Sequence, residues 1–137
     1  MINLIPGINS SSSALDAERI RMEVISQNIA NVNTTRDTDG NPYQRKQVVF
    51  ESVLQQQGGQ SQGVQVASVQ TYKRPPRLVF NPGHPDANAA GMVAVPDINI
   101  HEEMADLIAS SRSFEANLAV VKNGRTMAMQ ALSIGRH

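Results

Sequence analysis

The fold is decided by residues 98–135, whose sequence is INIHEEMADLIASSRSFEANLAVVKNGRTMAMQALSIG. Apolar residues recur along this stretch at intervals of three, four and seven, which places them on one face of an α-helix. They are Met104, Leu107, Phe114, Leu118, Val121, Ala128 and Leu132. Such a repeat over about four heptads predicts a long helix with an apolar seam for a partner helix.

The start of this helix carries capping signals. Asp97 or Asn99 can supply the N-cap, because Asp and Asn side chains accept hydrogen bonds from the free N–H groups of a first turn. Glu102 and Glu103 follow in the first turn, where the helix dipole favours acids. We expect a helix of roughly 35 residues that opens at Pro96-Asp97 and ends near residues 134–135, with a length of about 50 Å at about 1.5 Å per residue.

A second seam lies near the start of the chain. Its apolar residues are Ile8, Leu15, Met22 and Ile29, with Ile25 and Val32 on the interleaved track. The pattern predicts a helix over residues 10–32, capped within residues 9–13 and closed by a polar run that contains Asn28, Asn31 and Asn33. A chain with a seam at each end can pair its own ends, or pair with copies or relatives. This layout is typical of a building block rather than a catalyst.

The last helix carries a further stripe, about 110° around its axis from the seam. The stripe becomes apolar and small toward its end, and its members are Val120, Gly124, Met127, Ala131 and Ile134. Either the middle of the chain covers this face within one subunit, or neighbouring subunits do. We favour neighbouring subunits, because one helical hairpin offers only a thin core against the backbone entropy of folding. We therefore expect the ends of the isolated chain to be poorly ordered by circular dichroism.

The middle of the chain changes to a period of two. Strands are expected over residues 43–54 and 64–72, with a short third strand at residues 78–80. The Gln/Gly tract Gln55–Gly63 predicts a loop or hairpin tip, and turns are expected at residues 37–42 and 81–91. The fold class is mainly α with a small β insert, its terminal helices paired as a coiled coil. Residues 1–35 and 97–137 would form the helical domain and residues 36–96 the insert.

Composition excludes several classes of protein. The chain has 137 residues, of which 40% are hydrophobic, and no Trp, so a large compact core is not expected. A formal net charge of +0 gives no reason to expect nucleic acid or an anionic membrane as partner. The chain has no cysteine, which excludes disulfides and thiolate zinc sites. We expect neither a cleaved secretory signal nor a membrane-spanning helix.

Catalytic patterns are missing from the sequence. The histidines His84, His101 and His137 lack metal-ligand spacing, and the pair Glu102 and Glu103 suits a helix start. No nucleophile elbow or phosphate loop is present. The basic residues near the two tyrosines could suggest RNA binding, but aromatic residues make up only 4% of the chain. We expect no enzyme activity, cofactor, metal, nucleic acid or small-molecule substrate.

Four motifs, in order along the chain, resemble a known family. Ser26–Thr34 (SQNIANVNT) and Glu102–Asn117 (EEMADLIASSRSFEAN) resemble the two signatures of bacterial flagellar rod and hook proteins. Tyr43–Phe50 (YQRKQVVF) and Asn81–Asn88 (NPGHPDAN) resemble a proximal-rod member of that family. The resemblance covers nearly the whole chain, although the tract at residues 55–63 matches no motif.

The resemblance implies a structural subunit of the proximal rod of the flagellar basal body. Such subunits leave by the flagellar type III apparatus without signal cleavage and polymerise helically in the periplasm. Their partners would be other rod proteins, copies of the chain and, during assembly, components of the inner-membrane ring and export gate, with no membrane insertion. The rod would transmit motor torque to the hook and filament. The motif residues implied are Asn28, Asn31, Asn33 and Thr34.

Two alternatives stay open at this point. Phe50 and Leu54 resemble the family's short export-gate docking pattern, but an ordinary strand interior explains them equally well. A stand-alone coiled-coil adaptor that holds one other protein would also use terminal helices. Assembly behaviour distinguishes these functions, because a rod subunit joins a helical polymer and an adaptor forms a one-to-one complex.

Overall fold

The computed structural model describes residues 6–54 and 61–135, and it contains two long helices and two small antiparallel sheets. In chain order the elements are α1 (Pro6–Ala30), β1 (Lys46–Leu54), β2 (Ser61–Thr71), β3 (Arg77–Phe80), β4 (Met92–Val95) and α2 (Ile100–Ile134). The expected mainly α class with a small antiparallel insert is therefore confirmed. The conformation of residues 55–60 at the hairpin tip lies outside the described residues.

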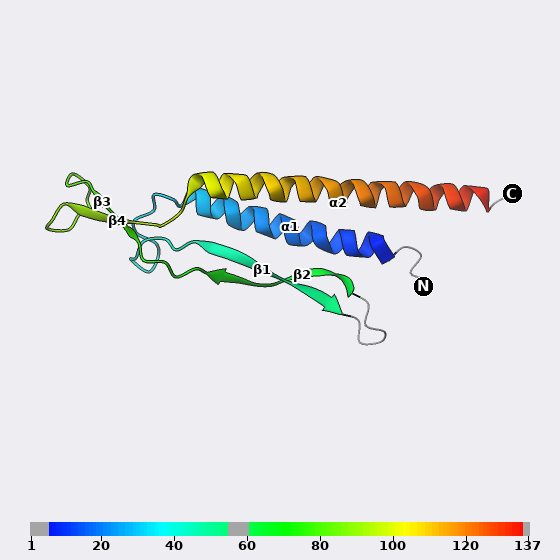
Figure 1. Cartoon of the computed structure of the whole chain (residues 1–137), viewed down its shortest axis with the longest axis horizontal. Coiled ribbons are helices and arrows are strands. Elements are labelled where there is room, and N and C mark those ends of the chain that lie inside the picture. Colours follow the sequence, from blue (N-terminus) through cyan, green and yellow to red (C-terminus); the bar gives the residue numbers. More distant parts are fainter. Residues whose placement is uncertain (1–5, 55–60, 136–137) are drawn as a thin grey trace.

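The two helices lie antiparallel and side by side (Figure 1). Contacts from Gly124 to Ile8, from Ser110 to Glu18 and from Glu103 to Asn28 fix this direction. At 35 residues α2 is longer than α1, which has 25, and its last turns extend beyond the start of α1 (Figure 1).

The helix starts differ in how well the sequence predicted them. Asn99 is the N-cap of α2, as expected, and its side chain accepts from the His101 N–H at 3.0 Å. The first helix begins at Pro6, earlier than predicted, because proline fits a first turn that leaves its N–H groups unpaired. The serines expected to cap it lie inside α1, where the Ser13 hydroxyl donates to the Ser10 carbonyl at 2.8 Å.

The face that α2 turns toward α1 is a row of small and polar residues spaced seven apart. Its members are Glu103, Ser110, Asn117 and Gly124, all buried except the half-buried Asn117. A Cβ atom on Gly124 would come within 2.7 Å of Ile8, so the two helices touch closely there. Gly124 therefore packs within the chain, and the expectation that it faces neighbouring subunits needs correction on this point. The physical reasoning holds, because a small residue admits a close helix, but that helix is α1.

The β1–β2 hairpin covers a different side of α1, so that α1 lies between the hairpin and α2 (Figure 1). Gly63 has φ +154°, and a Cβ there would come within 2.2 Å of the Ser13 hydroxyl. The neighbouring Val64 N–H donates to that hydroxyl at 3.1 Å. The alternative in which the β segment covers the last helix is therefore not the arrangement seen. Part of the expected insert packs on a helix of the expected helical domain.

The β3–β4 sheet stands at the end of the molecule opposite to the termini of the chain (Figure 1). The sequence missed β4, because four residues after a long turn give too short a pattern to identify. Ion pairs from Arg74 and Arg77 to Asp97 link this sheet to the start of α2, at 3.6 and 3.9 Å.

Asp86, in the loop between β3 and β4, links this end of the molecule to the segment after α1. Its carboxylate accepts a hydrogen bond from Thr35 at 2.8 Å and pairs with Arg36. The hydrogen bond from Thr35, followed by the charges of Arg36 and His84, lowers the pKa of the Asp86 carboxyl below its usual 3.8. The loop is thus held by a carboxylate whose ionised form these contacts favour.

Replacing Gly124 by leucine should separate the start of α1 from α2, because the new side chain occupies the space of Ile8. Overpacking of this kind costs about 1–3 kcal/mol. Hydrogen exchange should show faster exchange in the first turns of α1, with little change near Asn28. Ala119→Leu, at an exposed position of α2, is the matched control. Equal exchange in both variants would contradict the close contact.

Candidate functional site

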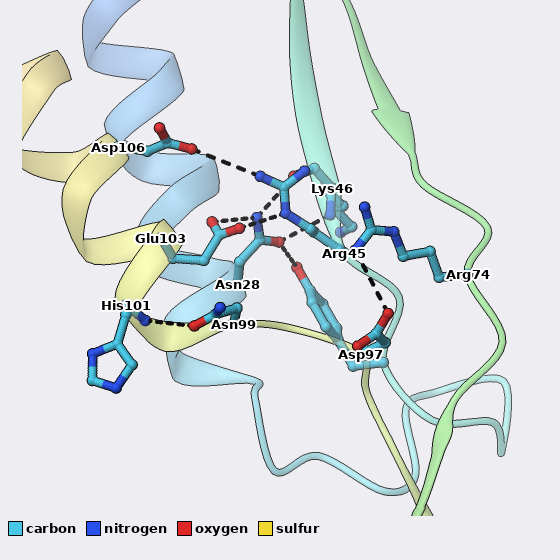
Figure 2. A network of polar contacts seen from close by, with 10 residues as sticks. Asn28, Arg45, Lys46, Arg74, Asp97, Asn99, His101, Glu103 and Asp106 are labelled. Atoms are coloured by element: carbon cyan, nitrogen blue, oxygen red, sulfur yellow. Dashed lines mark hydrogen bonds and ion pairs between the residues drawn. The ribbon is translucent and has the colours of Figure 1, made fainter.

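The side chain of Asn28 uses all four of its hydrogen-bonding positions (Figure 2). Its Nδ2 donates to the Lys46 carbonyl at 2.8 Å and to Glu103 Oε2 at 3.1 Å. Its Oδ1 accepts from the Tyr43 hydroxyl at 3.0 Å and from the Lys46 N–H at 2.9 Å. The side chain is 1% exposed. One amide therefore joins the end of α1 to β1 and to the first turn of α2.

The Glu103 carboxylate is buried beside this amide, with 1% exposure. Burying a carboxylate is costly unless it is paired and hydrogen-bonded. Arg45 supplies the pairing through its Nε, and its Nη2 lies 3.9 Å from Asp106, one turn further along α2 (Figure 2). The result is a fully paired junction of three segments, and we call Asn28, Tyr43, Arg45 and Glu103 the junction cluster.

Tyr43 is the neutral donor of the junction cluster. Burial raises the pKa of its hydroxyl above 10.0, and the negative charges of Asp37 and Glu103 raise it further. The hydroxyl is consequently protonated at neutral pH and available to donate to Asn28. The Lys46 ammonium lies 5.7 Å from the centre of its ring, within range of a cation–π contact.

The remaining motif residues close α1. The Asn31 side chain donates to the Gln27 carbonyl at 2.8 Å and accepts from the Thr34 hydroxyl at 3.0 Å. The Thr34 carbonyl then accepts from the Tyr43 N–H at 3.1 Å, which leads the chain into the junction cluster. Asn33 is exposed to solvent. Three of the four motif residues thus have contacts that shape the helix end.

The residues of the two expected seams differ in how deeply they are buried. In α1, Ile25 is buried, and the half-buried members are Ile8, Leu15, Met22 and Ile29, with Val32 half-buried just beyond the helix. In α2 the half-buried members are Leu107, Phe114, Leu118, Val121 and Ala128, which flank the row that faces α1. Met104 and Leu132 are exposed, so the helix contact is rotated away from them. The small residues at 110 and 124 explain this rotation, because they allow the closer approach.

The expected subunit-packing face remains open apart from Gly124. Val120 is 50% exposed, Met127 61% and Ile134 76%, and Ala131 is also exposed. The sequence analysis missed a second exposed stripe in the first half of α2, formed by Ile100, Met104 and Ile108. Their spacing of four was visible in the sequence, but only Met104 was assigned, and it was assigned to the seam.

Phe50 is half-buried and lines a groove of about 350 Å³ together with Val24, Ile25 and Val48. The groove runs between α1 and β1, with Asp106 of α2 at its margin. Of Leu54, only the backbone at the end of β1 is described. The expected export motif therefore lies partly outside the described residues and stays a prediction.

Comparison with known proteins identifies both helical ends. A model for "Flagella basal body rod protein" matches residues 8–36, and one for "Flagellar basal body rod FlgEFG protein C-terminal" matches residues 89–134. The flagellar basal-body rod protein FlgC of Borreliella burgdorferi is 38% identical, over 97% of this chain and 98% of the relative. FlgC of Bacillus subtilis is 40% identical, over 94% and 96%. FlgC of Salmonella typhimurium is 38% identical, over 92% and 93%.

The chain belongs to the FlgC family of flagellar basal-body rod proteins. It is a structural subunit of the basal-body rod, and this family membership implies assembly with other flagellar components rather than catalysis. The junction cluster contains residues from both of the segments that match the family models. Asn28 lies in the first and Glu103 in the second, so their hydrogen bond joins the two parts that mark the rod family.

Other types of site receive little support in this FlgC-family chain. Among the residues that the structure describes, no group of three or more His, Cys, Asp or Glu side chains could hold a metal ion. Neither described helix is long and apolar enough to cross a bilayer. A cleft of about 570 Å³ is lined by residues between Asp37 and Asp97, among them charged residues of both signs.

Replacing Asn28 by alanine should loosen the junction of α1, β1 and α2. The change leaves the buried Glu103 carboxylate without one donor and the Lys46 backbone without its partners. Each unsatisfied buried group costs about 1–3 kcal/mol, so we expect the free energy of unfolding to fall by at least this amount. Chemical denaturation measures it. Asn33→Ala, in the same motif but exposed, should change stability little. Equal effects of the two substitutions would contradict the role of Asn28.

Proposed function

We propose that α1 and α2 form the coiled-coil element of a proximal-rod subunit, through which this FlgC-family chain packs against neighbouring axial subunits. One observation carries the proposal: α2 presents apolar side chains in two directions that α1 does not cover. At about 100° per residue, the stripe of Ile100, Met104 and Ile108 lies roughly 140° from that of Val120, Met127 and Ile134. The row that contacts α1 takes the third side of the helix.

The energetics support burial of both stripes in an assembly. Fully burying each such side chain contributes about 1.5–3 kcal/mol relative to leaving it in water. Contiguous exposed apolar surface of this kind marks interaction sites. The extension of α2 beyond α1 adds Met129 and Leu132 to the uncovered surface (Figure 1). A one-to-one adaptor needs a single interface, whereas two stripes on different sides favour a subunit with several neighbours.

The proposal also gives each segment of the chain a role in the rod. The predicted helical domain, residues 1–35 and 97–137, would form the rod core, and residues 36–96 would form an insert that lies on its outside. Other rod proteins and copies of the chain would be the neighbours, and torque would pass through the packed helices to the hook and filament. The chain would reach the periplasm through the flagellar type III apparatus, without signal cleavage, after contact with the export gate and inner-membrane ring.

Placing charges on the second stripe tests the helical assembly. The double variant Val120→Asp, Met127→Asp should abolish swimming and stop rod growth, because two carboxylates would be buried at subunit contacts. Basal bodies isolated from such cells should contain the ring but no complete rod. Ala119→Asp, exposed on α2 between the two stripes, is the control and should retain most motility. Normal rods in the double variant would contradict the proposed packing face.

A second test concerns export. If Phe50 and Leu54 dock to the export gate, the double variant Phe50→Ala, Leu54→Ala should secrete several-fold less protein than the unmodified chain. Val53→Ala, exposed on the same strand, is the control. Secretion into the periplasm can be measured in cells that lack the other rod proteins, so that rod assembly does not affect the result. Unchanged secretion would leave the two residues with a role in the strand only.

A further inference from the structure

Strand β3 has an open edge. Among the strands that the structure describes it pairs only with β4, and all four of its residues are exposed. Among the described large apolar side chains outside α2, those of Leu78 and Phe80 are the most exposed, at 61% and 69%. Neither α1 nor α2 packs against β3. This surface is therefore separate from the helix faces of the proposed rod core.

The direction of the backbone groups follows from the register. The Asn81 N–H donates to the Gly91 carbonyl at 2.8 Å, and the next partners are Phe80 with Met92 and Val79 with Val93. Hydrogen-bonded and non-bonded pairs alternate in an antiparallel ladder. The 79–93 and 77–95 pairs are then the bonded ones. Leu78 and Phe80 consequently direct their backbone N–H and C=O groups to the open edge, the same residues whose side chains are exposed.

Several of the usual protections of an edge strand are missing in β3, although the strand has only four residues. Proteins protect open edges with bulges, or with proline or charged residues along the strand. The β3–β4 register is continuous, and within β3 only Arg77, at its first position, is charged. In β1–β2, by contrast, the register shifts at two places and β2 carries several polar residues. The β3 edge therefore has the properties of a template for another strand.

The charges beside the edge are mainly positive. Arg74 and Arg77 share one carboxylate, that of Asp97, at 3.6 and 3.9 Å. Lys73 lies next to them in the sequence and is exposed. Lys73 and Arg74 thus come before β3 and Arg77 is its first residue, while Asp97 pairs with the two arginines. Charge complementarity favours an acidic partner at this end of the strand.

We propose that the β3 edge binds an extended segment of a partner protein, which adds a third strand to the β3–β4 sheet. The segment would carry apolar residues opposite Leu78 and Phe80 and an acidic residue near Arg74 and Arg77. Open backbone groups in β geometry are matched by an extended peptide, which supplies N–H and C=O groups at the same repeat. This interaction goes beyond the helical packing proposed above and does not depend on it.

Synthetic peptides on the intact, isotope-labelled chain test the proposal. The probe is a peptide of alternating valine and glutamate, compared with a valine–lysine peptide and with a valine–glutamate peptide methylated at alternate backbone nitrogens. The valine–glutamate peptide should shift the NMR signals of residues 77–80. It should also slow amide exchange at Leu78 and Phe80 by about tenfold, the effect of one added hydrogen bond. Both control peptides should bind more weakly.

Two variants separate backbone recognition from charge. Leu78→Pro removes the outward N–H but leaves the Arg77 and Val79 bonds to β4, so it should abolish binding, whereas Leu78→Val should retain it. Arg74→Glu with Arg77→Glu should reverse the preference toward the valine–lysine peptide. Equal binding of the methylated peptide, or unchanged binding by both Leu78→Pro and the charge reversal, would overturn the proposal. Signal shifts at β3 with anionic lipid vesicles alone, or self-association lost in Leu78→Pro, would also overturn it, in favour of a membrane or a second copy.

Discussion

The structure depends on one buried amide. Asn28 lies at the point where the first helix ends, the first strand begins and the last helix starts, and it makes a hydrogen bond to each of these segments or to the tyrosine beside them. Its side chain both donates to the Lys46 carbonyl and accepts from the Lys46 N–H, as the backbone of a neighbouring strand residue would. Asn28 at the end of α1 therefore takes the place of a strand partner for the start of β1. Its bond to Glu103 makes a buried carboxylate tolerable, because Arg45 supplies the opposite charge on the other side.

Close helix contact is the second constraint, and it operates at the far end of α1. Ser110 and Gly124 are small enough for α1 to approach, and the larger apolar residues are displaced to the sides of the contact. The same rotation leaves Met104 and Leu132 on the surface. The small side chains of Ser110 and Gly124 therefore have two effects. They allow α1 and α2 to pack closely, and they leave larger apolar side chains of α2 exposed to solvent. A helix that contacted α1 through its largest residues would retain less apolar surface for other contacts.

Periodicity was enough to predict both helices and the two strands β1 and β2, because each extends over many residues. Capping side chains restricted the N-cap of α2 to Asp97 or Asn99, and the structure shows Asn99. Periodicity could not predict which face of α2 meets α1, since an apolar stripe and a row of small residues compete for that role in the sequence alone. The same limit applies to the junction cluster. Asn28 was identified by its motif, but its partners at 43, 46 and 103 depend on tertiary geometry. Neither spacing nor propensity indicates that Glu103, an ordinary first-turn acid, is buried.

The separation of Asn28 and Glu103 along the chain has a consequence for the order of folding. The two residues are 75 positions apart, so the bond between them cannot form until most of the chain is free to fold. A polypeptide that emerges from a narrow channel with its amino end first would release Asn28 long before Glu103. During that interval α1 lacks the partner that covers it, and the chain stays open. The fold would thereby be completed only when passage is nearly finished, which suits the export route proposed above.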